Sequence, residues 1–341
     1  MYNRQSGDEV EVYISNLRRV MTMPKGEQVG SGKFLYEFVD DWENLPEGYS
    51  WPETAGVITD SEDNVYVFNR GDHPMMVFDS NGNFLDSWGE GIFSRPHGVS
   101  LGPDNTIYCS DDGDHTVRQC TLEGKVLMTI GAPGNPSQPF SGLPFNRCTH
   151  TATDPESGDI FITDGYGNSR VHKYSPDGKL IESWGGPGVG EGEFNIVHNI
   201  ATDKDGYLYV CDRENHRVQV FDRHGKFESI WATVHRPCAI YIDDDERIYV
   251  AELGYGTPIS QAVPNIGPRI SVLDKSGKVL ERIGHLGYGL EPGQFVAPHG
   301  LCLDSELNIY VAEVARTNMS HYTTPPDVVR SFQKLRKLHE M

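Results

Sequence analysis

The sequence predicts an all-β protein built as a six-bladed β-propeller, and three observations carry that prediction. One pattern recurs six times, with copies of roughly 40–60 residues, which is within or near the range for propeller blades. Each copy holds three or four short runs rich in Val, Ile, Tyr and Phe, separated by Gly, Asp and Asn turns. No stretch has a helical period of comparable strength except Val328 to Leu338, which could equally be a third strand of the last copy.

The six copies share a small residue or His, a short apolar strand, an Asp-rich turn, an IYV-type strand, a polar loop, an RVxVFD-type strand and a GK or GN turn. They begin at Gly56, His97, Thr149, His198, Cys238 and His299. The sixth copy lacks an outermost strand, and Lys33 to Trp42 resembles the strands that end other copies. We expect this N-terminal strand to close the ring and remove an exposed sheet edge. The predicted division is an extension at 1–32 and a propeller at 33–341.

Composition narrows the classes of partner. With 29 Lys and Arg against 49 Asp and Glu, the net charge is −20, which disfavours nucleic acid as a partner. No run approaches the roughly 20 apolar residues that span a membrane, and Met1 to Val20 lacks the apolar core of a secretory signal. The six cysteines form no CxxC pair. These features predict a cytoplasmic protein without a membrane partner.

Three histidines are placed as metal ligands would be. His97, His198 and His299 open the innermost strands of copies two, four and six, at two intervals of 101 residues. Alternate blades of a six-bladed ring lie about 120° apart, so the three imidazoles should converge on the central channel. Three neutral imidazoles with one open position suit a catalytic Zn²⁺, although Cu, Fe or Ni would also fit. The alternative is that each histidine is a packing or turn residue.

The polar turns between the second and third strands should surround the same mouth of the channel. They carry Arg70, Tyr166 and Arg213. Two guanidinium groups can clamp a substrate carboxylate, and a phenol beside a metal cation can act as a general base. The alternatives are ion pairs with neighbouring acids for the arginines and a packed aromatic for the tyrosine.

The repeated IYV and RVxVFD strands resemble NHL repeats from about Gly56 onward. The motifs VFNRGDH, RPHGV, TDGYGNSR, CDRENHR and APHGL further resemble the catalytic core of the peptidyl-α-hydroxyglycine α-amidating lyases. That resemblance implies a six-bladed propeller with a zinc site, a catalytic tyrosine and two functional arginines. It assigns zinc to His97, His198 and His299, and catalysis to Tyr166, Arg70 and Arg213.

The sequence also departs from that family. Gly167 stands where the family has a disulfide-forming cysteine after the tyrosine, and the second family disulfide lacks its partners. Main-chain oxygens of Val57 and Val99 match two positions of the family's structural calcium site. Gly300, however, replaces the aspartate that completes it, which counts against calcium because this hard cation prefers charged oxygen ligands.

The resemblance implies a zinc-dependent lyase that cleaves a carbinolamide-type C–N bond. Its substrate would be a small molecule bearing a carboxylate, α-hydroxyglycine-like or a ureido-hydroxy acid, and its products an amide and a carbonyl acid such as glyoxylate. A lactonase-like metal-dependent hydrolase and a non-enzymatic NHL binding propeller remain alternatives. The sequence does not define the substrate's size, the oligomeric state, or the role of the insertion at 256–268.

Overall fold

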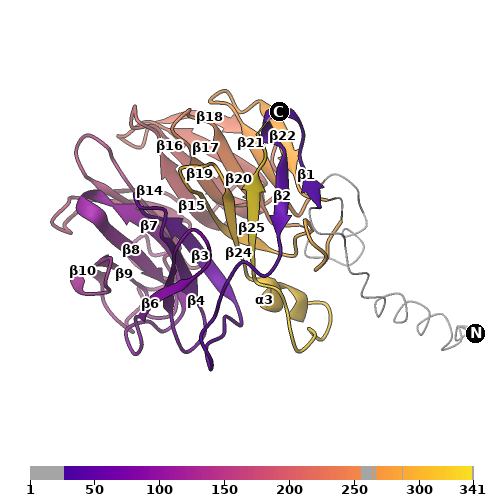
Figure 1. Cartoon of the computed structure of the whole chain (residues 1–341). Coiled ribbons are helices and arrows are strands. Elements are labelled where there is room, and N and C mark those ends of the chain that lie inside the picture. Colours follow the sequence, from indigo (N-terminus) through magenta and orange to yellow (C-terminus); the bar gives the residue numbers. More distant parts are fainter. Residues whose placement is uncertain (1–26, 255–262, 264–265, 286, 340–341) are drawn as a thin grey trace, which may run out of the picture.

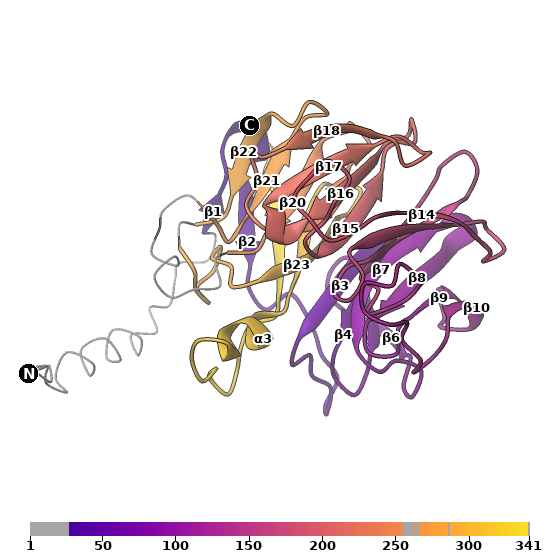
Figure 2. The same cartoon turned by 180° about the vertical axis from the view of Figure 1, so that it is seen from behind.

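Each repeat folds into one antiparallel sheet, and the six sheets form the predicted six-bladed propeller. The computed structural model describes residues 27–254, 263, 266–285 and 287–339. Figures 1 and 2 show the chain passing through the blades in sequence order, with the indigo N-terminal strands beside the yellow C-terminal strand. No helix in these described ranges is long and apolar enough to cross a bilayer.

Blades one to five each contain four consecutive strands, of which the first is innermost. Blade one contains β3 (Thr54–Thr59), β4 (Val65–Asn69), β5 (Met75–Phe78) and β6 (Phe84–Trp88), and blade two contains β7 (Pro96–Gly102), β8 (Thr106–Asp111), β9 (Thr116–Thr121) and β10 (Val126–Gly131). Blade three contains β11 (His150–Thr153), β12 (Ile160–Asp164), β13 (Arg170–Tyr174) and β14 (Leu180–Gly185), and blade four contains β15 (Val197–Thr202), β16 (Leu208–Asp212), β17 (Arg217–Phe221) and β18 (Phe227–Trp231). Blade five contains β19 (Pro237–Ile242), β20 (Ile248–Glu252), β21 (Arg269–Leu273) and β22 (Val279–Ile283).

The sixth blade joins the two ends of the described chain. It contains β23 (Pro298–Leu303), β24 (Ile309–Glu313) and β25 (Phe332–Lys337), followed by β2 (Tyr36–Val39) and β1 (Gln28–Val29). Strand β2 pairs with β25 in antiparallel register, from Tyr36 opposite Lys337 to Val39 opposite Lys334. The closing N-terminal strand is therefore present, and most of Val328 to Leu338 is a strand rather than a helix. Strand β1 lies within residues 1–32, which the sequence analysis assigned to an N-terminal extension. Residues 1–26 lie outside the described ranges.

Burial explains the strand sequences. The second strand of every blade is buried along its whole length, because neighbouring blades cover both of its faces. Its tyrosine hydroxyl bonds to the Asp of the preceding turn in three blades, as from Tyr310 to Asp304 at 2.9 Å. All six cysteines are buried and unpaired, as expected for thiols that pack as small hydrophobes.

Aromatic packing stabilises the contact between the first and last blades. The ring of Trp42, just after β2, lies 5.3 Å from Tyr310 and 5.5 Å from Phe332 of blade six, and 5.6 Å from Phe78 of blade one. One N-terminal side chain therefore contacts both the last and the first blade. A helix, α3 (Ala315–Ser320), follows β24 on the face where the innermost strands begin.

We expect Trp42→Ala to lower the free energy of unfolding by about 3–5 kcal/mol, because it leaves a cavity between the first and last blades. Urea unfolding followed by far-UV circular dichroism measures the change. Val189→Ala is the control, because Val189 is 76% exposed and should change stability little. Equal stability of the two variants would contradict this account of the closure.

Candidate metal centre

Three imidazoles from alternate blades meet on the propeller axis. His97, His198 and His299 are each the second residue of an innermost strand, β7, β15 and β23. Their ring centroids lie 4.6–4.8 Å apart, and their ligand nitrogens lie within 4.8 Å of one another. All three side chains are buried. The convergence expected from the 101-residue spacing is present, and this group could hold a metal ion.

The intervening blades orient these rings through backbone carbonyls. Nδ1 lies 2.8 Å from the Thr149 oxygen for His97, 2.7 Å from the Cys238 oxygen for His198, and 2.6 Å from the Ala55 oxygen for His299. A carbonyl only accepts, so each Nδ1 carries the proton and donates it. Each Nε2 therefore keeps its lone pair, which is the arrangement that metal-binding histidines use.

The carbonyl that holds His299 corrects the alignment of the first blade. Gly56 was expected to be the counterpart of the histidines, but Ala55 occupies that place. A register irregularity falls between Thr54 and Gly56, and the same irregularity brackets His97 between Pro96 and Gly98. Because both blades carry this bulge, Ala55, Gly56 and Val57 align with His97, Gly98 and Val99 without a shift.

Electrostatics favours neutral imidazoles. Burial lowers the pKa of His97 well below its ordinary value, and the neighbouring imidazoles and Arg70 lower it further. Burial followed by Arg213 lowers the pKa of His198 in the same way, and burial followed by Arg70 lowers that of His299. A metal ion binds only the neutral form, so the site is prepared to take one.

Tyr166 lies over this cluster. It follows strand β12, and its hydroxyl is 3.1 Å from Nε2 of both His97 and His198. Nη1 of Arg213 is 3.4 Å from the same oxygen. The phenol expected at the mouth therefore lies on the nitrogens that would bind a metal, within reach of a group bound there.

The two predicted arginines are tied to acids; Arg213 is buried, and the side chain of Arg70 is 10% exposed. Arg70 donates from Nε to the Pro96 carbonyl at 2.9 Å and from Nη1 to Glu53 at 2.7 Å. Arg213 donates from Nε to Glu214 at 2.9 Å. Burial acts to lower the pKa of Arg213, but Tyr166, Cys238 and Glu214 hold it above its ordinary value. Arg213 therefore stays charged beside the histidines.

Sequence reasoning missed further charged residues at this mouth. Arg147 stacks on Tyr166, with its guanidinium carbon 4.3 Å from the ring centroid. Asp112 bonds to both Arg147 and Arg95. Arg95 and Arg147 each stand two residues before the place of the histidine in their blade, at His97 and Thr149, and comparison of that position across the repeats would have revealed them.

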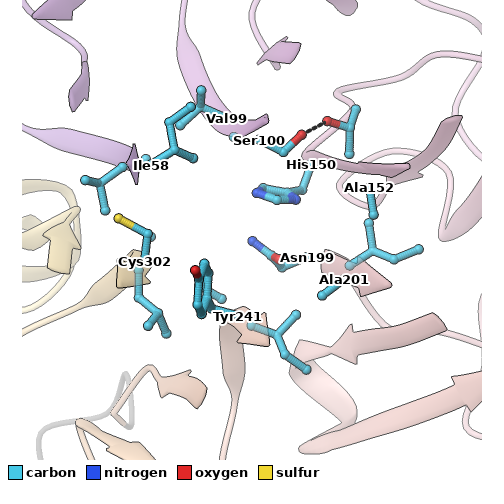
Figure 3. Close-up of a pocket in the computed structure, with 18 of the residues that line it drawn as sticks. Ile58, Val99, Ser100, His150, Ala152, Asn199, Ala201, Tyr241 and Cys302 are labelled. Carbon is cyan, nitrogen blue, oxygen red and sulfur yellow. Dashed lines mark hydrogen bonds between the residues drawn. The ribbon is translucent and has the colours of Figure 1, made fainter. Parts of the chain in front are cut away.

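The opposite side of the histidines opens into a cavity of about 220 Å³ on the axis. Figure 3 shows His150 and Asn199 directed into it, with Tyr241 and Cys302 on its wall. His150 therefore lines the channel beyond the three-histidine cluster. Among the described residues, the Nδ1 atom of His150 and the Oδ1 atom of Asn199 are buried there without a hydrogen-bond partner.

The two valines expected at a calcium site also line this cavity. Its lining contains no carboxylate, and a Cβ on Gly300 would lie 2.8 Å from the Gly56 Cα atom. Because an aspartate at 300 would collide with the first blade, the surroundings of Val57 and Val99 do not suit calcium.

A second acidic group, Asp203, Asp205 and Glu246, has metal-like spacing on another surface. The Lys275 ammonium lies within 3.0 Å of all three carboxylates. That position is therefore filled by a cation of the chain itself. Residues 255–262 and 264–265, which cover most of the insertion at 256–268, lie outside the described ranges.

We expect His198→Ala to reduce bound zinc to background while the propeller stays folded, since one of three converging ligands is lost. Plasma mass spectrometry of dialysed protein measures the metal, and circular dichroism measures the fold. The exposed His224 lies in an outer turn, so His224→Ala should keep the wild-type metal content. Full metal retention by His198→Ala would contradict the ligand assignment.

Comparison with known proteins places the chain among NHL proteins. Residues 194–221 match the NHL repeat family. The chain is 30% identical over 275 residues to NHL repeat-containing protein 3 of Mus musculus, covering 76% of this chain and 75% of that protein. It is 33% identical over 163 residues to peptidyl-alpha-hydroxyglycine alpha-amidating lyase 1 of Drosophila melanogaster, covering 44% of this chain. The match spans 29% of the fly lyase's own length.

Solved structures confirm the architecture. A gluconolactonase from Xanthomonas campestris superposes with a TM-score of 0.61 at 10% identity, covering 92% of this chain and 99% of its own. At that identity the likeness concerns the fold alone.

Proposed function

We propose that this chain, which belongs to the family of NHL repeat-containing protein 3, is a zinc-dependent lyase acting on a small carbinolamide-type acid. One observation carries the proposal: the Tyr166 hydroxyl lies 3.1 Å from Nε2 of two imidazoles in the three-histidine cluster. A phenol placed beside three neutral metal ligands can act as the general base that removes a proton from a substrate hydroxyl. The similarity to a protein named as an α-amidating lyase supports the same reaction class.

The choice of zinc follows from the ligands. Three neutral imidazoles with no carboxylate or thiolate suit a catalytic Zn²⁺ with an open position. When bound, zinc would supply Lewis-acid polarisation of the substrate hydroxyl. The three carbonyl contacts at Nδ1 hold the rings in the required tautomer, so little reorganisation is needed on binding.

In this reaction Tyr166 accepts the proton of a hydroxyl on the carbon that also bears nitrogen and a carboxylate. The C–O bond becomes a carbonyl, the C–N bond breaks, and the nitrogen takes a proton. An α-hydroxyglycine-type substrate would give an amide and glyoxylate, and a ureido-hydroxy acid would give urea or its derivative and glyoxylate. Arg70 and Arg213 orient the carboxylate, because two guanidinium groups held by Glu53 and Glu214 can bind it by paired hydrogen bonds.

The six buried, unpaired cysteines support a reducing compartment, the cytoplasm, as the place of action. A metal-dependent hydrolase is the alternative on the same scaffold. It would need an activated water to attack an ester, whereas the lyase needs only proton transfer at Tyr166. The product distinguishes them, since only the lyase releases a carbonyl acid from a carbinolamide.

We expect Tyr166→Phe to lower turnover by about 100-fold or more while keeping the metal, because it removes only the proton acceptor. The assay follows glyoxylate release from N-benzoyl-α-hydroxyglycine and from ureidoglycolate by the zinc-loaded protein. Tyr207→Phe is the matched control, since Tyr207 is 41% exposed and lies outside the site. Wild-type turnover by Tyr166→Phe would refute the base assignment, and no carbonyl release by the wild type would refute the lyase.

A further inference from the structure

We propose that Arg95 and Arg147 form a second anion-binding subsite beside Tyr166, so that the substrate is a small acid with two anionic groups. The inference deepens the proposed lyase function and rests on it for the position of the reacting carbon. Neither arginine lies in the turns that carry Arg70 and Arg213. Both come from the loops that lead into the innermost strands of blades two and three.

A buried carboxylate holds the pair together. Oδ2 of Asp112 accepts from Nη1 of Arg95 at 2.6 Å, and from Nη2 and Nε of Arg147 at 2.5 and 3.1 Å. The Asp112 side chain is 0% exposed, whereas those of Arg95 and Arg147 are 36% and 40% exposed. Asp112 therefore fixes both guanidinium groups from the protein side while leaving their outer edges accessible to a ligand.

Donors remain available on those outer edges. In the described part of the chain, Nη1 of Arg147 and both Nε and Nη2 of Arg95 have no hydrogen-bond acceptor. One carboxylate also neutralises only one of the two positive charges. The pair thus retains one positive charge and several directed N–H groups, which is what a carboxylate requires.

The pair adjoins the reacting atoms. Arg147 covers one face of the Tyr166 ring at 4.3 Å, and the hydroxyl of that ring contacts His97 and His198. Arg70 and Arg213 are the deeper arginines, with side chains only 10% exposed. One carboxylate can therefore lie deep beside the histidines while a second anionic group lies nearer to solvent.

Charge balance around the mouth supports an anionic ligand. Five arginines at the mouth share three side-chain ion-pair partners, Glu53, Asp112 and Glu214; the arginines are Arg70, Arg95, Arg147, Arg213 and Arg236. The whole chain, by contrast, carries −20. Arginines that share a carboxylate keep N–H groups and positive charge for a small anion.

Calorimetric binding of two α-hydroxy acids to the zinc-loaded full chain tests the subsite. Glycolate has one carboxylate and malate has two, and neither has a nitrogen leaving group. We expect malate to bind about tenfold more tightly than glycolate to the wild type. Arg147→Gln and Arg95→Gln should each remove most of that preference while leaving glycolate affinity within about twofold.

Arg223→Gln is the matched control, because it removes one positive charge from an ion pair with Glu156, away from this mouth. Equal affinities of the wild type for the two acids, no binding of either, or the same loss in the control would overturn the proposal. An equal loss of affinity for glycolate and malate in Arg147→Gln would also overturn the proposal, because Arg147 would then act only by supporting Tyr166. Neither acid can be cleaved, so this binding test is independent of the glyoxylate assay with the carbinolamide substrates. A preference for malate without glyoxylate release in that assay would refute the lyase alone. Glyoxylate release without a preference for malate would refute the subsite alone.

Discussion

The site depends on one repeated interaction, the hydrogen bond from the Nδ1 of a histidine to a carbonyl of the next blade. Blades three, five and one supply these acceptors to histidines of blades two, four and six. The third contact joins His299 near the end of the chain to Ala55 near its beginning, so it forms only when the ring is closed. Pairing of β2 with β25 and the packing of Trp42 are therefore conditions for the metal centre as well as for stability. The contacts that close the ring therefore also help to orient the three histidines.

The two sides of the histidine cluster differ in polarity. The mouth holds Tyr166 and the arginines, each guanidinium restrained by a buried or half-buried acid. The channel side is lined by small and apolar side chains with His150 and Asn199 among them, and its lining has no carboxylate. Charged substrate groups are consequently stabilised only on the mouth side. In the proposed reaction, this asymmetry orients the acid with its hydroxyl toward Tyr166 and its carboxylates toward the arginines.

The sequence predicted the architecture because the second strand of every blade is buried on both faces. A strand covered on both faces needs an apolar run, and in three blades its tyrosine bonds to the Asp of the preceding turn, so the pattern recurs visibly. The histidines were predictable for the same reason, since equal spacing on alternate repeats implies convergence. Gly56 was aligned with the histidines by mistake, since Gly56 and Val57 match Gly98 and Val99 and Ala55 is therefore the counterpart of His97. Arg147 and Asp112 escaped notice because their partnership joins two loops from different blades, and no spacing within one repeat encodes it.

X-ray absorption at the zinc edge of the metal-loaded protein tests the central claim most directly. The account predicts a first shell of nitrogen and oxygen atoms at roughly 2.0–2.1 Å, with the multiple scattering of three imidazoles. A shell containing sulfur, or one of oxygen atoms alone as the Asp203, Asp205 and Glu246 group would provide, would contradict it.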